Sequence, residues 1–228
     1  MTDPTTVYAT DEDIALRAAA DFAILCPKDQ CLAYGADGQI GTDRWSLSSP
    51  TVDFSTNGVA AGQVVRLTQP VTVFKPPGDA LVIDSIVGGA VVLRRKGMPS
   101  GVGQPAAPSG GLTNVEFTIA TLAPQIALAS DDLDRRFGIS DLIAGRRPCD
   151  LFDPREVLDA TVLTVLSRQY LELSHGTPER ADTFAAKAQA YRQELDNLLD
   201  RMVVHWASVA GIATPIESTT RLSTRLSR

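Results

Sequence analysis

The spacing of apolar residues changes twice along the chain, and these changes limit the folds that the sequence can adopt. Before about residue 30 and after Pro124, apolar residues recur at helical spacing. Between these points the apolar runs shorten to strand length, are rich in β-branched residues and are separated by glycine and proline. The sequence therefore predicts an α+β protein in which a helical part is interrupted by short strands.

The first predicted helix covers about residues 11–25. Thr10 can cap it, and Asp11–Asp13 place negative charge on its first turn, where the helix dipole favours it. Pro27 ends the helical run.

Six segments in the middle of the chain have the length and composition of strands. Gly88 and Gly89 separate two of them and can take the positive φ angles of a two-residue hairpin turn. Residues 97–111 (GMPSGVGQPAAPSGG) predict a linker or an exposed loop. The pattern favours a small barrel or a compact antiparallel sheet. The strands are expected at Arg44–Ser48, Val64–Thr68, Val71–Phe74, Ala80–Val87 and Ala90–Arg95, with Val115–Thr121 as a further strand or the lead-in to the next unit.

After Pro124 the pattern is helical again. Ser130 is expected to cap a helix that ends at Gly138, and further helices are expected at about 154–175 and 178–209. The last helix carries a heptad-like apolar stripe, which is typical of an antiparallel hairpin with the preceding helix or of a self-associating coiled coil. The stripe consists of Phe184, Ala188, Tyr191, Leu195, Leu198, Met202, His205 and Val209.

These segments predict four parts. Residues 1–29 form the first helix of a bundle, residues 30–121 an inserted small antiparallel β-barrel with the loop 97–111, residues 122–210 the rest of the bundle, and residues 211–228 an extended C-terminal arm. The arm is either a disordered basic tail or a peptide that becomes ordered on a partner, because its two leucines are four residues apart. Its candidate partner-binding residues are Arg221, Leu222, Arg225, Leu226 and Arg228.

The sequence carries no motif of a known catalytic or cofactor site. It has no phosphate-binding loop, no zinc-protease motif and no nucleophile elbow, so no enzyme, cofactor or metal is expected. Cys26 and Cys31 have no second pair of ligands, and Cys149 has no nearby histidine. His175 falls at a predicted helix end and His205 on the apolar stripe.

Charge and hydropathy exclude further classes of protein. The formal net charge of −6 argues against a protein that mainly grips nucleic acid phosphates. No apolar run approaches the roughly 20 residues that span a bilayer, and the acidic N-terminus lacks the features of a signal peptide. We therefore expect synthesis in the cytoplasm and no membrane partner.

The order of these segments resembles the head-to-tail connector (adaptor) proteins of bacteriophages. The resemblance rests on the helical segments at 122–139, 151–160 and 185–199 with Tyr170, and the segments at 26–38, 45–47 and 62–65 are similar to a barrel inserted in some of these connectors. It implies a connector-like helical bundle in a structural virion protein at the head–tail neck, made in the cytoplasm of the bacterial host. The protein would form a homo-oligomeric ring, a dodecamer, between the portal protein and a neck or tail protein.

In that role genomic DNA passes through the ring without specific recognition, and the arginines and leucines of the C-terminal arm predict that it docks on the portal. A neck or stopper protein and a tail terminator are alternative roles. A small-ligand-binding barrel is a third alternative, for which the strands offer mainly Arg66, Asp84, Arg94 and Arg95 as polar groups.

Overall fold

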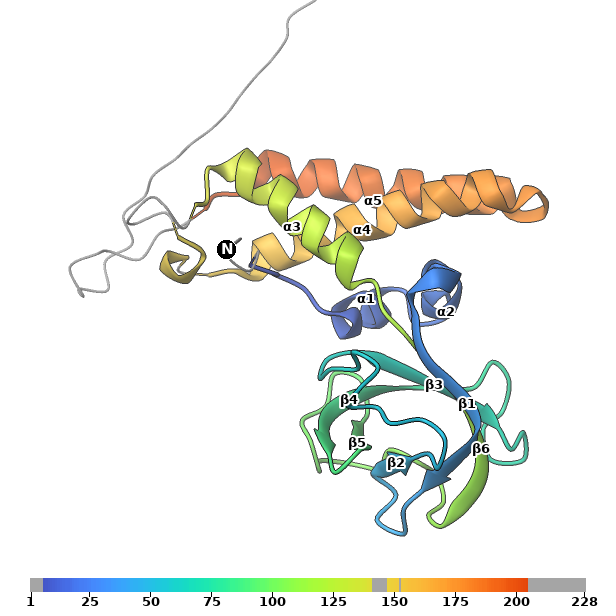
Figure 1. Cartoon of the computed structure of the whole chain (residues 1–228). Helices are drawn as coiled ribbons and strands as arrows, with labels where there is room; N and C mark the ends of the chain where they lie inside the picture. Colours follow the sequence, from blue (N-terminus) through green and yellow to red (C-terminus); the bar gives the residue numbers. More distant parts are fainter. Residues whose placement is uncertain (1–5, 141–146, 152, 205–228) are drawn as a thin grey trace, which may run out of the picture. The chain divides into compact units, whose positions relative to one another are not determined.

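The computed structural model describes residues 6–140, 147–151 and 153–204. They divide into two compact units, one made of residues 10–124 and the other of the residues before Thr10 together with those after Pro124. The first unit contains a closed antiparallel β-barrel and two short helices, and the second contains three longer helices (Figure 1). The described fold is therefore mixed α+β.

The barrel has six strands. Around its circumference they follow the order β1-β2-β5-β4-β3-β6, and every neighbouring pair is antiparallel. Closure leaves no free sheet edge in this part of the chain. The strands are β1 (Cys31–Ile40), β2 (Ser46–Ser48), β3 (Val64–Gln69), β4 (Asp79–Val87), β5 (Ala90–Arg94) and β6 (Leu112–Ala120).

Aromatic side chains fill the interior of the barrel. Phe54, Phe74 and Phe117 are fully buried, and the rings of Phe54 and Phe117 meet edge to face with centroids 5.4 Å apart. Along β6, Val115, Phe117 and Ile119 are buried while the residues between them are exposed or half-buried, which is the alternation of a strand with one face on a core.

The structure confirms part of the strand prediction. Gly88 and Gly89 both have positive φ angles and join β4 to β5, as the hairpin prediction requires. The predicted strand Val71–Phe74 is wrong, because the amides of Val73 and Phe74 donate to the carbonyl of Pro70 and fold this segment into a turn. β1 was not predicted as a strand. It is the longest strand of the barrel and pairs with β6 along one of its edges.

Residues 97–111 are not a free linker. Ala106 and Ala107 are fully buried in the barrel core. The amide of Ala107 donates to the carbonyl of Arg44, and the Nε of Arg44 donates back to the carbonyl of Ala107 at 3.2 Å. This loop therefore closes over the barrel instead of linking two units, although Met98 and Val102 remain exposed.

The first helix belongs to the barrel unit, so the prediction of a helical bundle with an inserted barrel is wrong. α1 (Asp11–Arg17) is followed by a break and by α2 (Phe22–Leu25), and both lie within residues 10–124. Thr10 caps α1, as predicted, and the structure adds a capping box with Asp13. The other two acids of the first turn bond to the barrel unit itself. The carboxylate of Asp11 accepts the amide of Leu122 at 2.7 Å, and the carboxylate of Glu12 pairs with the Arg94 guanidinium.

The Glu12–Arg94 ion pair of the barrel unit has further partners on both sides. The Oε1 of Glu12 accepts from Nη1 of Arg94 at 2.6 Å and from the amide of Gly97 at 2.8 Å, while the Nε of Arg94 lies 3.4 Å from Asp84. Burial alone would raise the pKa of Glu12, but the hydrogen bonds from Arg94 and Gly97 outweigh it and hold the pKa below its usual value. At Asp11, burial prevails over the bonds from Leu122 and Thr121 and raises the pKa.

We expect Glu12→Gln to lower the stability of the barrel unit at pH 7 by about 2 kcal/mol, because it removes charge-assisted hydrogen bonds. Since folding lowers the pKa of Glu12, its contribution is complete above the unfolded value of about 4.3 and is lost as the pH falls through the folded value. Urea unfolding of both proteins from pH 7 to pH 3 should therefore show a difference that shrinks in acid. Glu116→Gln, on an exposed position of β6, is the control. A difference that is the same at both pH values would contradict the role assigned to the pair.

The second unit is built on α3 (Ala123–Phe137), α4 (Arg155–Gly176) and α5 (Ala181–Arg201), with short 3-10 turns at Pro148–Asp150 and Pro178–Arg180. Leu133 of α3 packs with Val157 and Leu163 of α4 and with Leu195 and Leu198 of α5. Figure 1 shows α4 and α5 side by side as a long antiparallel hairpin, with α3 against them. Three helices therefore share this core, instead of the four predicted segments.

Two details of the predicted helices need correction. α3 begins seven residues before Ser130, whose hydroxyl is buried inside the helix, donates to the carbonyl of Ile126 and accepts the amide of Tyr8. Ser130 is therefore not a cap, whereas Gly138 has the positive φ of the predicted helix end. In α5, Phe184, Ala188, Leu195 and Leu198 are buried, as the stripe predicts. The last predicted stripe positions, His205 and Val209, and the whole C-terminal arm lie outside the described residues.

Candidate functional site

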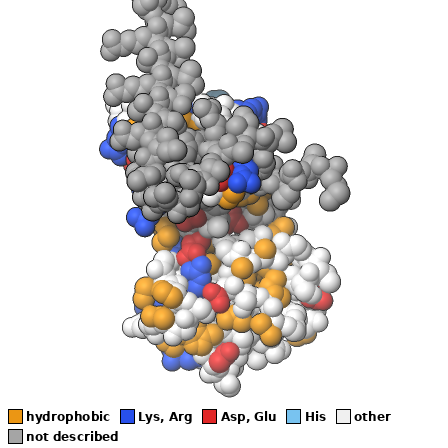
Figure 2. All heavy atoms as spheres, turned by 90° about the vertical axis from the view of Figure 1, so that its left-hand side faces the viewer, with side chains coloured by type: hydrophobic (Ala, Val, Ile, Leu, Met, Phe, Trp, Pro, Cys, Tyr) orange, Lys and Arg blue, Asp and Glu red, His pale blue; other side chains and the backbone are white. Residues whose placement is uncertain are grey.

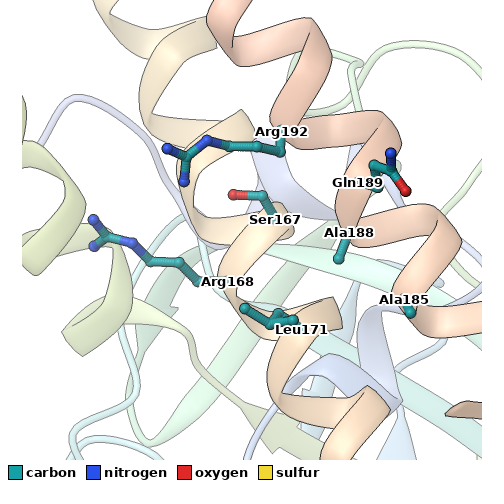
Figure 3. Close-up of a pocket in the computed structure, with 7 residues that line it drawn as sticks. All are labelled: Ser167, Arg168, Leu171, Ala185, Ala188, Gln189 and Arg192. Carbon is teal, nitrogen blue, oxygen red and sulfur yellow. The ribbon is translucent and has the colours of Figure 1, made fainter. Parts of the chain in front are cut away.

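A groove runs along the seam between α4 and α5. Its cavity volume is about 230 Å³, and small or apolar side chains form most of its lining. Figure 3 shows the two arginines directed to the same side of the groove, with the alanines of α5 facing α4. The lining residues are Ser167, Arg168 and Leu171 of α4 and Ala185, Ala188, Gln189 and Arg192 of α5.

An aromatic stack holds the two helices together beside this groove. The ring of Tyr170 on α4 is stacked on Tyr191 with centroids 5.6 Å apart and lies 6.1 Å from the ring of Phe184, both on α5. The Nζ of Lys187 lies 5.2 Å from the centre of the Tyr170 ring. Ala188 belongs to the same apolar stripe of α5 as Phe184 and Tyr191, whereas Ala185 lies on the neighbouring face, so the groove borders the stack directly.

Two aspartates orient the arginines of the groove. The Nη2 of Arg168 lies 2.7 Å from Asp132 on α3, and the Nε of Arg192 lies 3.4 Å from Asp196 one turn further along α5. A guanidinium carries five N–H groups, so each arginine keeps donors beyond the one in its ion pair. Both side chains are about half exposed or more, and these pairs contribute little to stability in water.

The groove fits a side chain of another protein better than a reacting substrate. The hydroxyl of Ser167 donates to the carbonyl of Thr164 at 3.0 Å, so it is used within α4. Leu171 is half exposed, and an exposed leucine next to two alanines gives an apolar hollow bordered by cations. Such a hollow can take up an aliphatic side chain while the guanidiniums bind a carboxylate beside it.

None of the sequence-predicted candidates that the structure describes lines this groove. Arg221, Leu222, Arg225, Leu226 and Arg228 lie outside the described residues. Cys26 is half-buried, and burial raises the pKa of its thiol to about 12, whereas Cys31 and Cys149 are exposed. His175 lies in the last turn of α4.

Two acids that follow Ser130 take part in ion pairs. Asp131 and Asp132 lie in the middle of α3, where Asp131 pairs with Arg135 and Asp132 pairs with Arg168. Sequence reasoning missed the groove. The available signal was Ala188 on the apolar stripe of α5, with Ala185 on the neighbouring face.

The described residues hold neither a metal-binding cluster nor a membrane-spanning helix. In this part of the chain no group of three or more His, Cys, Asp or Glu side chains is placed to hold a metal ion. No helix within the described ranges is long and apolar enough to cross a bilayer. No family model, curated protein or solved structure matches the chain.

Proposed function

We propose that this chain is a structural virion protein, a head-to-tail connector that forms a ring between the portal and the tail of a bacteriophage. The proposal rests on the resemblance of the segments at 122–139, 151–160 and 185–199 to connector proteins and on the physical character of the described surface. In this role the protein is not an enzyme and needs no cofactor.

One observation carries the proposal, namely the groove between α4 and α5. Its alanines, half-exposed leucine and two arginines match the composition of protein interfaces, where an apolar centre is bordered by polar groups and arginine is enriched. A ring subunit needs such a surface on a rigid element, and the two long helices of this hairpin provide one.

The barrel does not favour the alternative of a small-ligand-binding protein. Its interior is occupied by buried aromatic and aliphatic side chains, including Phe54 and Phe117. The polar groups that could have served a ligand have local partners. The guanidinium of Arg66 donates to the carbonyl of Pro77, that of Arg94 pairs with Glu12, and the Nε of Arg95 donates to the carbonyl of Pro105.

The barrel surface agrees with a structural role. Figure 2 shows hydrophobic side chains interspersed with polar ones on the face of this unit that is turned to the viewer. Tyr34 and Val87 are among its exposed hydrophobic residues. Surfaces of this kind occur at contacts with other proteins and also on ordinary monomers, so they do not select one role in the neck. A neck, stopper or tail-terminator role is the second candidate.

In the proposed virion the partners are further copies of this chain in a dodecameric ring, the portal protein and a neighbouring neck or tail protein. Genomic DNA would pass through the ring without specific recognition. The net charge of −6 is compatible with this passage, since negative charge repels phosphate. The chain would be made in the bacterial cytoplasm and reside at the head–tail neck.

Electron microscopy of intact virions with labelled protein tests this assignment. We expect the label in a ring at the neck, next to the portal, and the protein in virions at a fixed copy number. Absence from virions, or presence only as a monomer, would rule the connector out. Presence at the tail end alone would favour the tail terminator.

We expect deletion of residues 215–228 to abolish binding to purified portal while leaving the melting temperature nearly unchanged. Arginine forms bidentate hydrogen bonds with carboxylates and keeps its charge when partly buried. Leu222 and Leu226 would share one helical face. Ordering the arm costs about 1–2 kcal/mol per residue, so the partner must bury the leucines as well as pair the arginines.

Three comparisons complete this experiment. Leu222→Ala with Leu226→Ala should weaken portal binding, whereas the matched control Ser223→Ala with Ser227→Ala should not. Binding to duplex DNA is measured in parallel, because the arginines could contact phosphates instead. A truncated protein that binds the portal with normal affinity would show that the arm is only a tail.

A further inference from the structure

The outer face of α3 carries an exposed leucine followed by an ion pair. Leu128 is 54% exposed, although it is one of the larger apolar side chains of the helical unit. Asp131 and Arg135 follow it on the same face and pair with each other, and both side chains are exposed. We call Leu128, Asp131 and Arg135 the α3 ridge.

The face of α5 that borders the groove repeats this spacing with opposite charges. Gln189, Arg192 and Asp196 occupy positions separated by three and then four residues, as in the ridge. Arg192 and Asp196 pair with each other and are also exposed. Next to Gln189 the half-exposed Leu171 and the alanines at 185 and 188 form the apolar hollow.

We propose that the α4/α5 groove binds the α3 ridge of a second copy of this chain. With α3 of one copy parallel to α5 of the next, Leu128 lies opposite Gln189 and enters the hollow, Asp131 faces Arg192 and Arg135 faces Asp196. All three pairs share one constant offset in residue number. This inference deepens the proposed function and rests on it in one respect, since it names the surfaces through which neighbouring ring subunits would meet.

The hollow is large enough for the leucine. Its cavity volume of about 230 Å³ exceeds the roughly 150 Å³ of an apolar cavity that takes up benzene. Leu128 would bring its exposed apolar surface out of water, and this makes it the anchor of the contact. The four charged residues contribute less energy, because ion pairs at a rim are screened by water and salt.

The charges instead select the orientation of the two helices. In the parallel arrangement each acid faces a base, whereas the antiparallel arrangement places Asp131 opposite Asp196 and Arg135 opposite Arg192. Like charges facing each other disfavour the wrong alignment, and this is the usual contribution of rim charges to specificity.

The contact joins two different surfaces, so it is head-to-tail and can continue from copy to copy. Such contacts close into a ring when the rotation between copies permits it and give open filaments otherwise. A contact of this kind is what a ring subunit requires.

Charge reversal of complete ion pairs tests the proposal while each helix keeps its own pair. The ridge swap combines Asp131→Arg with Arg135→Asp, and the groove swap combines Arg192→Asp with Asp196→Arg. Sedimentation over a range of protein concentrations at low salt should show self-association of the unchanged protein, which each swap alone weakens by about tenfold or more. The two swaps in one chain should restore it. Single swaps without effect, or a double swap that restores nothing, would overturn the proposal.

Disulfide trapping gives a second measurement that does not depend on a stable assembly. One chain carries Leu128→Cys and another Gln189→Cys, both in a background with Cys31→Ser and Cys149→Ser, since those two thiols are exposed. Mixed and oxidised, these chains should form a disulfide-linked dimer, because the paired positions bring their Cβ atoms within bonding range. Val87→Cys, at an exposed position of the barrel, replaces Leu128→Cys in the control mixture and should form none.

The outcomes separate this inference from the connector assignment. A trapped dimer and charge-dependent association in a protein that is absent from virions would sustain the contact and refute the connector. A protein found in the neck ring whose mixed chains give no trapped dimer would refute the contact alone. Loss of association on deleting residues 215–228, with no trapped dimer, would assign self-association to the C-terminal arm and overturn the proposal.

Discussion

Leu195→Asp should unfold the helical unit and leave the barrel folded. Leu195 is 6% exposed and packs with Leu198 of α5, Leu133 of α3 and residues of α4. Removing a leucine from such a core costs about 2–5 kcal/mol, and burying a carboxylate adds to that cost. Circular dichroism should show the loss of most helical signal at 25 °C. The barrel, which has its own core, should still melt as a separate transition.

Gln193→Asp is the matched control for this substitution. It adds the same charge to the same helix at an exposed position two residues earlier. Its melting curve should stay close to that of the unchanged protein, within about 0.5 kcal/mol. If Leu195→Asp melts like the control, the apolar face of α5 does not hold the three helices together.

Gly38→Ala should destabilise the barrel strongly. A Cβ at Gly38 would lie 2.7 Å from the carbonyl oxygen of Val115 and 2.9 Å from the ring of Phe117. Neither can retreat easily, because Val115 belongs to the paired strand β6 and Phe117 fills the core. Overpacking of this kind costs about 1–3 kcal/mol, and a clash with backbone places it at the upper end.

Urea unfolding followed by tryptophan fluorescence measures this loss, since Trp45 packs against the barrel core. Gly176→Ala serves as the control, because a Cβ at Gly176 meets no atom within 4 Å and its backbone needs no positive φ. An alanine at 38 that is tolerated as well as the alanine at 176 would mean that β1 and β6 can separate without loss.

Signals that act within a few residues were predictable from the sequence. Three local features depend on backbone conformation within a few residues, and the structure confirms each: the cap at Thr10, the hairpin glycines 88 and 89 and the helix end at Gly138. The same holds for the buried stripe of α5, where helical spacing alone selects Leu195 and Leu198.

Features that depend on distant contacts were not predictable. β1 was missed because the sequence of Gly35–Gly38 is typical of a turn. The close approach of Val115 and Phe117, at the other end of the barrel segment, explains why glycines stand in a strand there. The amphipathic helix α1 was assigned to a bundle because its spacing shows that one face is buried but does not show what covers that face.

The groove escaped prediction for a related reason. α4 has buried residues on all of its faces, so its apolar pattern does not mark which side contacts α5. The exposure of Leu128 and Leu171 can be known only after the helices are packed. The candidate arm, in contrast, stood out in the sequence through its repeated Thr-Arg-Leu-Ser unit, and it lies outside the described residues.

The hydrogen bond from the amide of Leu122 to the carboxylate of Asp11 ties together the two places where the chain enters and leaves the barrel unit. A segment whose ends are held so close together has the form of a cassette. Its removal would leave flanking residues that a short linker could rejoin, and its exchange for another domain would not require the helical unit to change its path.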